Sequence, residues 1–566
     1  MSAASRHLGR TAVWALLALT VATRLALAFA DYRSLIANDV YSDDAFYYLR
    51  IAANVAGGRG FTFDGAAPTN GFHPLYLLMV VPIMALSKGN LVLPIHLTAV
   101  LLTGWAAGTG AILHALLAKL AGRTIALFGL LLWAICPYFV LMSVNGLETG
   151  PSIFFAVALL YLYLSWFRAD RPPSARQSLA FGVVSGLAIL ARVDLALLLV
   201  AIAVDWAVAH RARLRQSASS AGLALAAAIV VWLPWGLVSR SSTGTWLPLS
   251  GPASRLLALN FGWHILQQIW VLSPHGLLFD PRHVPVDFYL DVVTKLGFVF
   301  VFESPLLAPL RANVAGGPWA SLDSYLPYQL FRRNPPVGTV VVLIIIVALA
   351  VVARRLSRAS SAPANAPLRT SLRRIVTVNL LLVGLGYSFY SPAHWYFNRY
   401  LVSAILLTTV WLLVDVVAVC AGLRRGRTAL AALAVAILVC QVTEWRFATA
   451  IRWSNAPPGG FLATWETLGR RVDRTARLGA FQAGIYGYFS GRDVINLDGK
   501  VNQDAFAALR DKRLHEYIRQ QGVRYVLDYD WVLEALCGRY AEGSGLSFRS
   551  IADTGGVTHL YEVVRN

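Results

Sequence analysis

The chain has 566 residues, of which 57% are hydrophobic and only 14% are charged, and its mean hydropathy is +0.58. This balance excludes an ordinary soluble domain and indicates a polytopic membrane protein. The net charge of +20 comes mostly from arginines in short loops, which act as topology signals, so no nucleic-acid partner is expected. The four cysteines form no CxxC pattern, and neither a disulfide framework nor a zinc site is predicted.

The first apolar run covers residues 11–30 and follows two arginines. Its length of roughly 20 residues is enough to cross a bilayer, so we expect an uncleaved membrane helix with a cytoplasmic N-terminus. A cleavable signal peptide is the alternative, because the run ends in Ala28-Phe29-Ala30.

Placing the later basic loops in the cytoplasm as well predicts about eleven crossing helices. The run Leu75–Leu86 does not cross on this path, because it is short, contains Pro82 and suits an interfacial or re-entrant segment. The crossing helices are expected at residues 11–30, 91–117, 124–143, 150–167, 178–191, 194–209, 220–240, 336–353, 375–390, 400–421 and 428–446.

This path sorts the polar segments to the outer, extracytoplasmic side of the membrane, which suggests a membrane-embedded active site. No internal repeat of fixed period is visible, so a transporter built from inverted halves is disfavoured. The outer segments are a first outer loop at 31–90, short turns at 144–149, 192–193 and 391–399, a long outer loop at 241–335 and the tail from residue 447.

The tail changes character, since short alternating runs at Val494–Leu497 and Tyr525–Leu527 flank a helix-like segment at Asp504–Gln521. This pattern is typical of a small α/β domain. We therefore predict a polytopic α-helical transmembrane domain at residues 1–446 and an extracytoplasmic α/β domain at residues 447–566. The tail has no GxGxxG motif, so a nucleotide site is not supported.

Asp43 and Asp44 lie just beyond the first helix, and adjacent carboxylates tend to raise the pKa of one member of the pair. One of them could then act as a base. Alternatively, the pair could share a hard divalent cation such as Mg²⁺ or Mn²⁺, which prefers oxygen ligands. A third interpretation assigns one of them to the N-cap of a short helix over Ala45–Val55.

Several motifs resemble those of one superfamily. Together they resemble the GT-C glycosyltransferases, in particular the branch that contains the mycobacterial terminal β-arabinofuranosyltransferase. The resemblance covers most of the chain and is more specific for the superfamily than for the sugar. Its motifs are Asp43–Arg50, Gly58–Asp64, Thr69–Leu75, Asn145–Thr149, Arg192–Asp194, Trp395–Tyr400, Tyr488-Phe489 and Asn496–Gly499.

The resemblance implies a GT-C-like fold and the inverting transfer of a sugar from a polyprenyl-phosphate carrier to an acceptor on the extracytoplasmic side. Asp44 or Asp43 would deprotonate the acceptor hydroxyl, and Asp44 is the first choice. Arg399 would meet the charge of the lipid phosphate. His394, Tyr396 and Tyr400 would stand beside it, with an interfacial belt of aromatic and basic residues as the alternative.

Further residues are candidates for binding the donor or substrate. Glu148 stands at a helix junction, where it could bind sugar hydroxyls or cap the helix. Arg192 and Asp194 could position the phosphate or the sugar, or pair with each other across a turn. Asn70 and His73 join these candidates, and a structural hydrogen-bonding role is the alternative for His73.

We therefore expect a multi-pass enzyme of the bacterial cytoplasmic membrane. Arabinofuranose is the first sugar to test, and a cell-envelope glycan or glycolipid is the expected acceptor. A mannosyl or hexosyl transferase acting on lipid or protein is the alternative within the enzyme class. Outside that class stand a transporter of lipid-linked substrates and an inactive scaffold, which substitution of Asp43 and Asp44 would separate from an enzyme.

Overall fold

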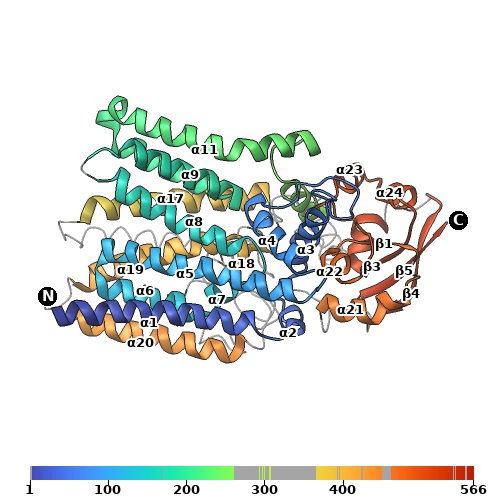
Figure 1. Cartoon of the computed structure of the whole chain (residues 1–566), viewed down its shortest axis with the longest axis horizontal. Helices are drawn as coiled ribbons and strands as arrows, with labels where there is room; N and C mark the ends of the chain where they lie inside the picture. Colours follow the sequence, from blue (N-terminus) through green and yellow to red (C-terminus); the bar gives the residue numbers. More distant parts are fainter. Residues whose placement is uncertain are drawn as a thin grey trace, which may run out of the picture.

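The computed structural model describes residues 3–169, 171–260, 365–391, 393, 396–421, 425–448, 460–473, 475–538, 541, 544–554 and 558–565, with six single positions between 292 and 306. A bundle of long helices forms one end of the molecule, and a sheet with short helices forms the other (Figure 1). The expected helix at 336–353 and most of the long outer loop lie outside the described residues.

The bundle consists of long apolar helices. Within the described residues, five are long and apolar enough to cross a bilayer, or six if the bent pair α6 (Arg123–Ile135) and α7 (Pro137–Ser143) counts as one span. The chain is therefore a multi-pass membrane protein. The five helices are α1 (Ala3–Ala28), α5 (Leu93–Ala121), α8 (Thr149–Leu162), α11 (Leu214–Thr243) and α17 (Ala366–Leu385), of which α8 and α17 continue into short π-helical turns.

Shorter apolar helices complete the bundle. Their positions agree with several expected spans, but length and composition within the described residues support fewer spans than the expected eleven. The interfacial placement of the 13-residue helix at 74–86 stays a prediction. These helices are α4 (Pro74–Leu86), α9 (Ala175–Ala191), α10 (Leu195–Ala209), α19 (Val402–Ala421) and α20 (Gly426–Ala448).

The chain bends by 65° between α6 and α7, where Pro137 starts a new helix because it cannot continue the first one. The bend leaves carbonyl groups at the end of α6 without partners in their own helix. Arg24 of α1 is fully buried and donates to the carbonyls of Trp133 at 2.7 Å and Ala134 at 3.1 Å. Arg24 thereby holds the start of α7, which leads into the turn before α8.

Two short helices, α2 (Tyr32–Ala37) and α3 (Asp43–Ala56), lie between the bundle and the sheet (Figure 1). A third, α18 (Phe397–Tyr400), directly precedes α19 of the bundle. The helix expected over Ala45–Val55 therefore begins two residues earlier. Ser42 is its N-cap residue, so the interpretation of either aspartate as the N-cap is wrong. Both aspartates instead lie in the first turn of α3, where their carboxylates can reach other elements.

The C-terminal part contains a five-stranded sheet with strand order β2-β1-β3-β5-β4. The strand β1 pairs parallel with β2 and β3, whereas β5 pairs antiparallel with β3 and β4. The helix-like segment at 504–521 is two helices separated at Lys512, which has a positive φ of 60°. The strands are β1 (Arg477–Ala480), β2 (Val494–Asn496), β3 (Val523–Tyr529), β4 (Leu546–Asp553) and β5 (Thr558–Arg565). The helices are α21 (Gly460–Leu468), α22 (Gly484–Phe489), α23 (Gln503–Arg510), α24 (Leu514–Gln520) and α25 (Asp530–Leu533).

One hydrophobic cluster joins the two parts, because it includes residues of α3 together with residues of the sheet and of α22. The backbones approach closely at two glycines. A Cβ atom on Gly484 would lie 2.1 Å from the carbonyl oxygen of Asp43, and one on Gly71 would lie 1.9 Å from that of Lys500. The C-terminal domain is thus packed directly against α3 and the first outer loop.

Candidate functional site

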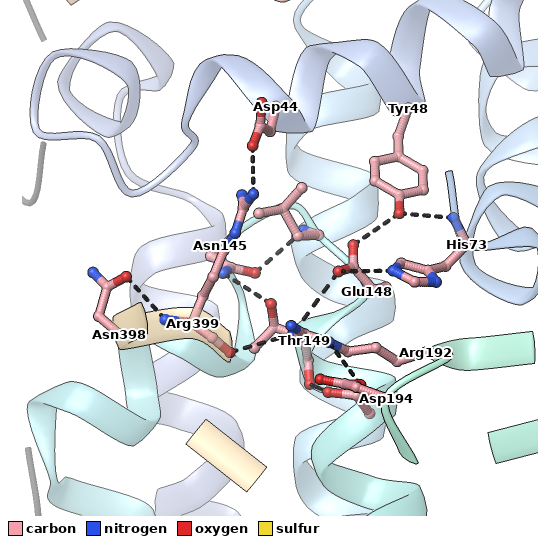
Figure 2. Close-up of polar contacts among 12 residues, drawn as sticks. Asp44, Tyr48, His73, Asn145, Glu148, Thr149, Arg192, Asp194, Asn398 and Arg399 are labelled. Atoms are coloured by element: carbon pink, nitrogen blue, oxygen red, sulfur yellow. Dashed lines mark hydrogen bonds and ion pairs between the residues drawn. The ribbon is translucent and has the colours of Figure 1, made fainter. Parts of the chain in front are cut away.

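Polar side chains from five separate segments meet where the bundle contacts the C-terminal domain. Figure 2 shows a continuous set of polar contacts that links α3, the loop before α4, the turn before α8, the turn before α10 and α18. The residues in this set include Asp44, Tyr48, His73, Glu148, Arg192, Asp194 and Arg399. The sequence-predicted clusters of the bundle are therefore brought together.

Asp44 has two cationic neighbours. Nη2 of Arg399 lies 2.5 Å from its Oδ2, and Nζ of Lys500 lies 3.7 Å from its Oδ1. Burial disfavours the charged form, but Lys500 and Arg399 outweigh it and hold the pKa of Asp44 below its ordinary value. Asp44 is therefore an anion, with Arg399 beside one of its carboxylate oxygens and Lys500 beside the other.

Asp43 points the other way, into the C-terminal domain. Its oxygens accept hydrogen bonds from the backbone N–H groups of Gly484 at 3.0 Å and Ile485 at 2.7 Å, at the first turn of α22. Burial raises the pKa of Asp43 to about 7, and these backbone hydrogen bonds offset part of that rise. Asp43 therefore joins the two domains through two backbone hydrogen bonds at the start of α22.

The two aspartates have separate partners and do not converge on one point, which does not fit a cation shared between them. The described part of the chain holds no group of three or more histidine, cysteine, aspartate or glutamate side chains that could bind a metal ion. The groups around Asp43 and Asp44 are backbone N–H groups and cationic side chains, which are hydrogen-bond donors and positive charges and do not bind a metal ion.

Glu148 is the N-cap residue of α8, but its side chain makes no capping hydrogen bond. Its Oε2 instead accepts a hydrogen bond from the Tyr48 hydroxyl at 2.8 Å. Nε2 of His73 lies 3.8 Å and Nη1 of Arg192 lies 3.9 Å from its Oε1. Burial opposes the charge of Glu148, but the charge of Arg192 and the hydrogen bond from Tyr48 keep its pKa below the ordinary value. The carboxylate is thus held ionised and turned into the site.

His73 is buried, and burial lowers its pKa, so the neutral imidazole is favoured near pH 7. Arg192 is then the standing positive charge beside Glu148. Nδ1 of His73 is buried and has no hydrogen-bond partner within the described residues. His73 is accordingly placed to exchange a hydrogen bond with a bound molecule.

Arg192 and Asp194 pair with each other, with Nε 3.1 Å from Oδ1, as one of the two interpretations expected. The Tyr387 hydroxyl donates to the other oxygen of Asp194. Arg192 also lies over the ring of Tyr400, 4.9 Å from its centroid, and its Nη1 donates to the carbonyl of Arg399 at 3.3 Å. The pair therefore also belongs to the wall of the site.

Arg399 lies between two aromatic rings of its own segment, 4.2 Å from the ring centroid of Tyr396 and 5.4 Å from that of Tyr400. Its Nε is buried and has no hydrogen-bond partner in the part of the chain that the structure describes. The rings thus orient a guanidinium toward Asp44 instead of forming only an interfacial belt. His394, the fourth residue predicted here, lies outside the described residues.

Asn70 lies apart from these contacts. Its side-chain amide donates to Ser239 and Thr245 and to the carbonyl of Leu247, and its oxygen accepts from the Leu249 amide. Asn70 therefore ties the first outer loop to the end of α11 and the segment that follows. Its predicted contact with the donor stays a prediction.

Lys500 is the main residue that sequence reasoning missed. It directly follows the motif Asn496–Gly499, and a charged residue next to a recognised motif is the feature by which the sequence could have predicted it. Its Nζ donates to the Tyr396 hydroxyl at 2.7 Å and lies 3.1 Å from Oδ2 of Asp498. Tyr48 was also missed, although it lies within the first motif.

Comparisons with known proteins support a common origin of part of the bundle and a shared fold. Residues 73–235 match the dolichyl-phosphate-mannose-protein mannosyltransferase family, and residues 449–564 match a domain of unknown function, DUF8728. A comparison with curated proteins finds no match.

Two solved proteins are similar over nearly the whole chain. ArnT from Cupriavidus metallidurans bound to undecaprenyl phosphate has 12% identity and a TM-score of 0.50, with 96% of this chain and 97% of that chain covered. Its apo structure has 11% identity and a TM-score of 0.52, covering 99% and 98%. The apo oligosaccharyltransferase of Archaeoglobus fulgidus has 13% identity and a TM-score of 0.52, covering 100% and 75%. The family match within the bundle and the shared fold together place this chain in the GT-C superfamily of glycosyltransferases.

Proposed function

We propose that this GT-C glycosyltransferase transfers a sugar, with inversion, from a polyprenyl-phosphate carrier to an acceptor hydroxyl on the extracytoplasmic side of the membrane. The observation that carries the proposal is the ion pair between Asp44 and Arg399 in the site. It holds a carboxylate and a guanidinium together, as deprotonation of an acceptor and binding of a leaving phosphate require.

In this proposal, Asp44 takes the proton of the acceptor hydroxyl as the acceptor oxygen forms a bond to the anomeric carbon. The bond between that carbon and the phosphate oxygen breaks, and its electron pair leaves with the polyprenyl phosphate. An ionised aspartate is a weak base, so its position matters more than its basicity. Asp43 is less suited to this role because both its oxygens accept backbone hydrogen bonds.

Arg399 meets the charge that develops on the phosphate. Its buried Nε without a partner in the described residues supports this role, because a bound phosphate oxygen would satisfy it. The aromatic rings of Tyr396 and Tyr400 keep the guanidinium in place. Because the arginine side chain is already ordered, it loses little conformational entropy when it binds a phosphate.

The group around Glu148 is suited to the sugar. Glu148 accepts hydrogen bonds, the neutral His73 can donate or accept one, and Arg192 supplies a fixed charge. Sugar hydroxyls both donate and accept hydrogen bonds, so they match this mixture. We assign the sugar to this part of the site and the phosphate to Arg399.

Arabinofuranose is the first donor sugar that we propose, because the motifs resemble those of the arabinofuranosyltransferase branch. Mannose is the second candidate, since the family that matches residues 73–235 is described as a dolichyl-phosphate-mannose-protein mannosyltransferase. We propose a cell-envelope glycan or glycolipid as the acceptor in the first case. We also propose that the protein lies in the bacterial cytoplasmic membrane with its C-terminal domain outside.

The test measures transfer by the purified full chain from synthetic polyprenyl-phosphate donors that carry arabinofuranose, mannose or another hexose to short glycan acceptors. The variants are Asp44→Asn and the matched control Asp504→Asn, an exposed aspartate of α23. Transfer that Asp44→Asn lowers by about 10²- to 10⁴-fold, with the control unchanged, supports Asp44 as the base.

Transfer by Asp44→Asn at the wild-type rate would overturn the role of Asp44. If no donor supports transfer while the protein still binds undecaprenyl phosphate, the enzyme proposal fails and the transporter or scaffold interpretation replaces it. The sugar that gives the highest rate identifies the donor.

A further inference from the structure

The C-terminal domain sends one charged side chain into the site. Lys500 follows the turn at Asp498-Gly499, in which Gly499 has a positive φ of 79°. A Cβ atom on Gly499 would lie 2.7 Å from the Cα of Phe506, so the turn fits closely against α23. The backbone N–H of Lys500 donates to Oδ1 of Asp498 at 2.9 Å, which fixes the direction in which the lysine leaves the turn.

Three groups then hold the ammonium of Lys500. It donates to the Tyr396 hydroxyl at 2.7 Å, and it lies 3.1 Å from Asp498 and 3.7 Å from Asp44. Its side chain is only 8% exposed. A flexible surface lysine does not sit in such a place, so the position of this charge is determined by the fold.

Asp44 thus has two cationic partners, although one would balance its charge. The charged groups that face Asp44 are Lys500, Arg399 and the neighbouring Asp43, and the tyrosines near it are Tyr47 and Tyr396. Those that face Lys500 are Asp44, Asp498, Tyr396 and Tyr47. Arg399 is the partner that also lies near Glu148 and carries a buried Nε without a partner in the described residues.

This difference between the two cations suggests a division of roles. If Arg399 binds the carrier phosphate as proposed above, its guanidinium turns toward the phosphate and its interaction with Asp44 weakens. Without a second cation, a nearly buried carboxylate would then be left beside Asp43 with no positive partner, which is costly. Lys500 is on the opposite oxygen of Asp44 and belongs to a different domain, so it is not moved by the same event.

We propose that Lys500 is a positioning residue of the catalytic site, which holds the carboxylate of Asp44 in place while Arg399 binds the carrier phosphate, so that both domains build the site. This inference rests on the proposed function. It gives the C-terminal domain a direct part in the reaction, because the contacts of Asp43 with α22 and of Gly71 with the backbone of Lys500 determine where the ammonium lies.

The test compares wild type with Lys500→Gln, Lys500→Met and Lys500→Arg in the full chain. Glutamine can still donate hydrogen bonds to Tyr396 and Asp498 but carries no charge, so it separates the charge from the packing. Lys512→Met is the matched control, because Lys512 is an exposed lysine of the same domain. Initial rates at varied donor concentration give kcat and KM, and titration with undecaprenyl phosphate gives the affinity for the carrier.

We expect Lys500→Gln to lower kcat by about 10- to 100-fold with the donor KM within about twofold of wild type, as for an interaction used after the donor has bound. Lys500→Arg should restore most of kcat, and Lys512→Met should match wild type. Carrier affinity should stay unchanged in Lys500→Gln but fall in Arg399→Met, which separates the two cations.

If the wild-type protein is active and Lys500→Gln has the same kcat, this inference is overturned, whereas the proposed function is not affected. A loss of carrier affinity in Lys500→Gln as large as in Arg399→Met would also overturn it, since Lys500 would then bind the phosphate directly. If wild type transfers no sugar from any donor, the proposed function fails and this inference fails with it. Limited proteolysis of each variant shows whether its C-terminal domain is still docked.

Discussion

Asp43 and Gly484 are in contact although they lie 441 positions apart along the chain, because the N–H of Gly484 donates to Oδ2 of Asp43 at 3.0 Å. The two backbones also approach each other closely, since a Cβ atom on Gly484 would lie 2.1 Å from the carbonyl oxygen of Asp43. Asp44, the next residue, faces Arg399 of the bundle. Of these two adjacent carboxylates, Asp43 therefore joins the domains and Asp44 forms part of the site.

The charge of Asp43 makes this domain contact depend on pH. Burial raises the pKa of Asp43 to about 7, above the value of about 3.9 expected for an unfolded chain. The folded state then binds a proton more tightly than the unfolded state. The stability gained in this way is fully present below about pH 4 and is lost as the pH rises through about 7. Asp528, whose pKa burial also raises to about 7, contributes in the same direction.

We expect the full chain to melt at a higher temperature at about pH 5.5 than at about pH 8, and Asp43→Asn to reduce this difference. The variant should also melt at a lower temperature at the acidic pH, because one of the two backbone N–H groups loses its acceptor. Asp504→Asn is the control and should keep the wild-type difference. The same difference in Asp43→Asn as in wild type would assign the pH dependence to Asp528 and not to Asp43.

The close approach at Gly484 predicts that Gly484→Ala loosens the C-terminal domain. The added methyl group meets backbone atoms, which cannot move without shifting α3 or α22, and such overpacking costs about 1–3 kcal/mol. Limited proteolysis should cleave the variant faster than wild type within residues 460–565. Gly104→Ala is the matched control, because a Cβ atom there would meet nothing within 4 Å. Equal cleavage rates in the two variants would contradict the prediction.

Much of the site could be predicted from the sequence, since buried charges stand out in an apolar chain and loop arginines indicate which ends of the helices meet. This is why Asp44, Glu148, Arg192 and Arg399 were predicted and lie together. The GT-C superfamily was also predicted correctly. The number of spans was less accessible, because α9 and α10 have only 17 and 15 residues, at or below the shortest length that crosses a bilayer, and length alone does not decide whether such helices cross.

Other features depend on how distant segments pack, which local patterns do not encode. The different roles of Asp43 and Asp44 follow from the position of α22, and the place of Lys500 follows from the turn at Gly499. The split of the segment at 504–521 into two helices occurs at Lys512, whose left-handed backbone conformation is uncommon for lysine and leaves no signal in hydropathy.

A last prediction concerns Arg24, which connects the bundle to the site from inside the membrane domain. Its guanidinium donates to the carbonyls of Trp133 and Ala134 at the bend between α6 and α7, and its Nε donates to Ser143 at 3.1 Å. Arg24→Met would remove the Arg24 donor from the Trp133 carbonyl, at a cost of about 1–3 kcal/mol, whereas the Ala134 carbonyl would still accept from the Thr23 hydroxyl at 3.0 Å. Since α7 leads directly into the turn that carries Glu148, the loss should also displace Glu148.

We therefore expect Arg24→Met to lower the melting temperature and also to raise the donor KM, whereas Arg24→Lys, which retains a donor, should lie between it and wild type. Arg10→Met, a change at an exposed arginine of the same helix, is the control and should alter neither quantity. If Arg24→Met lowers the melting temperature but leaves the donor KM unchanged, the bend stabilises the bundle without positioning Glu148. The guanidinium of Arg24, which lies more than a hundred positions before Glu148 in the sequence, would then contribute to stability alone.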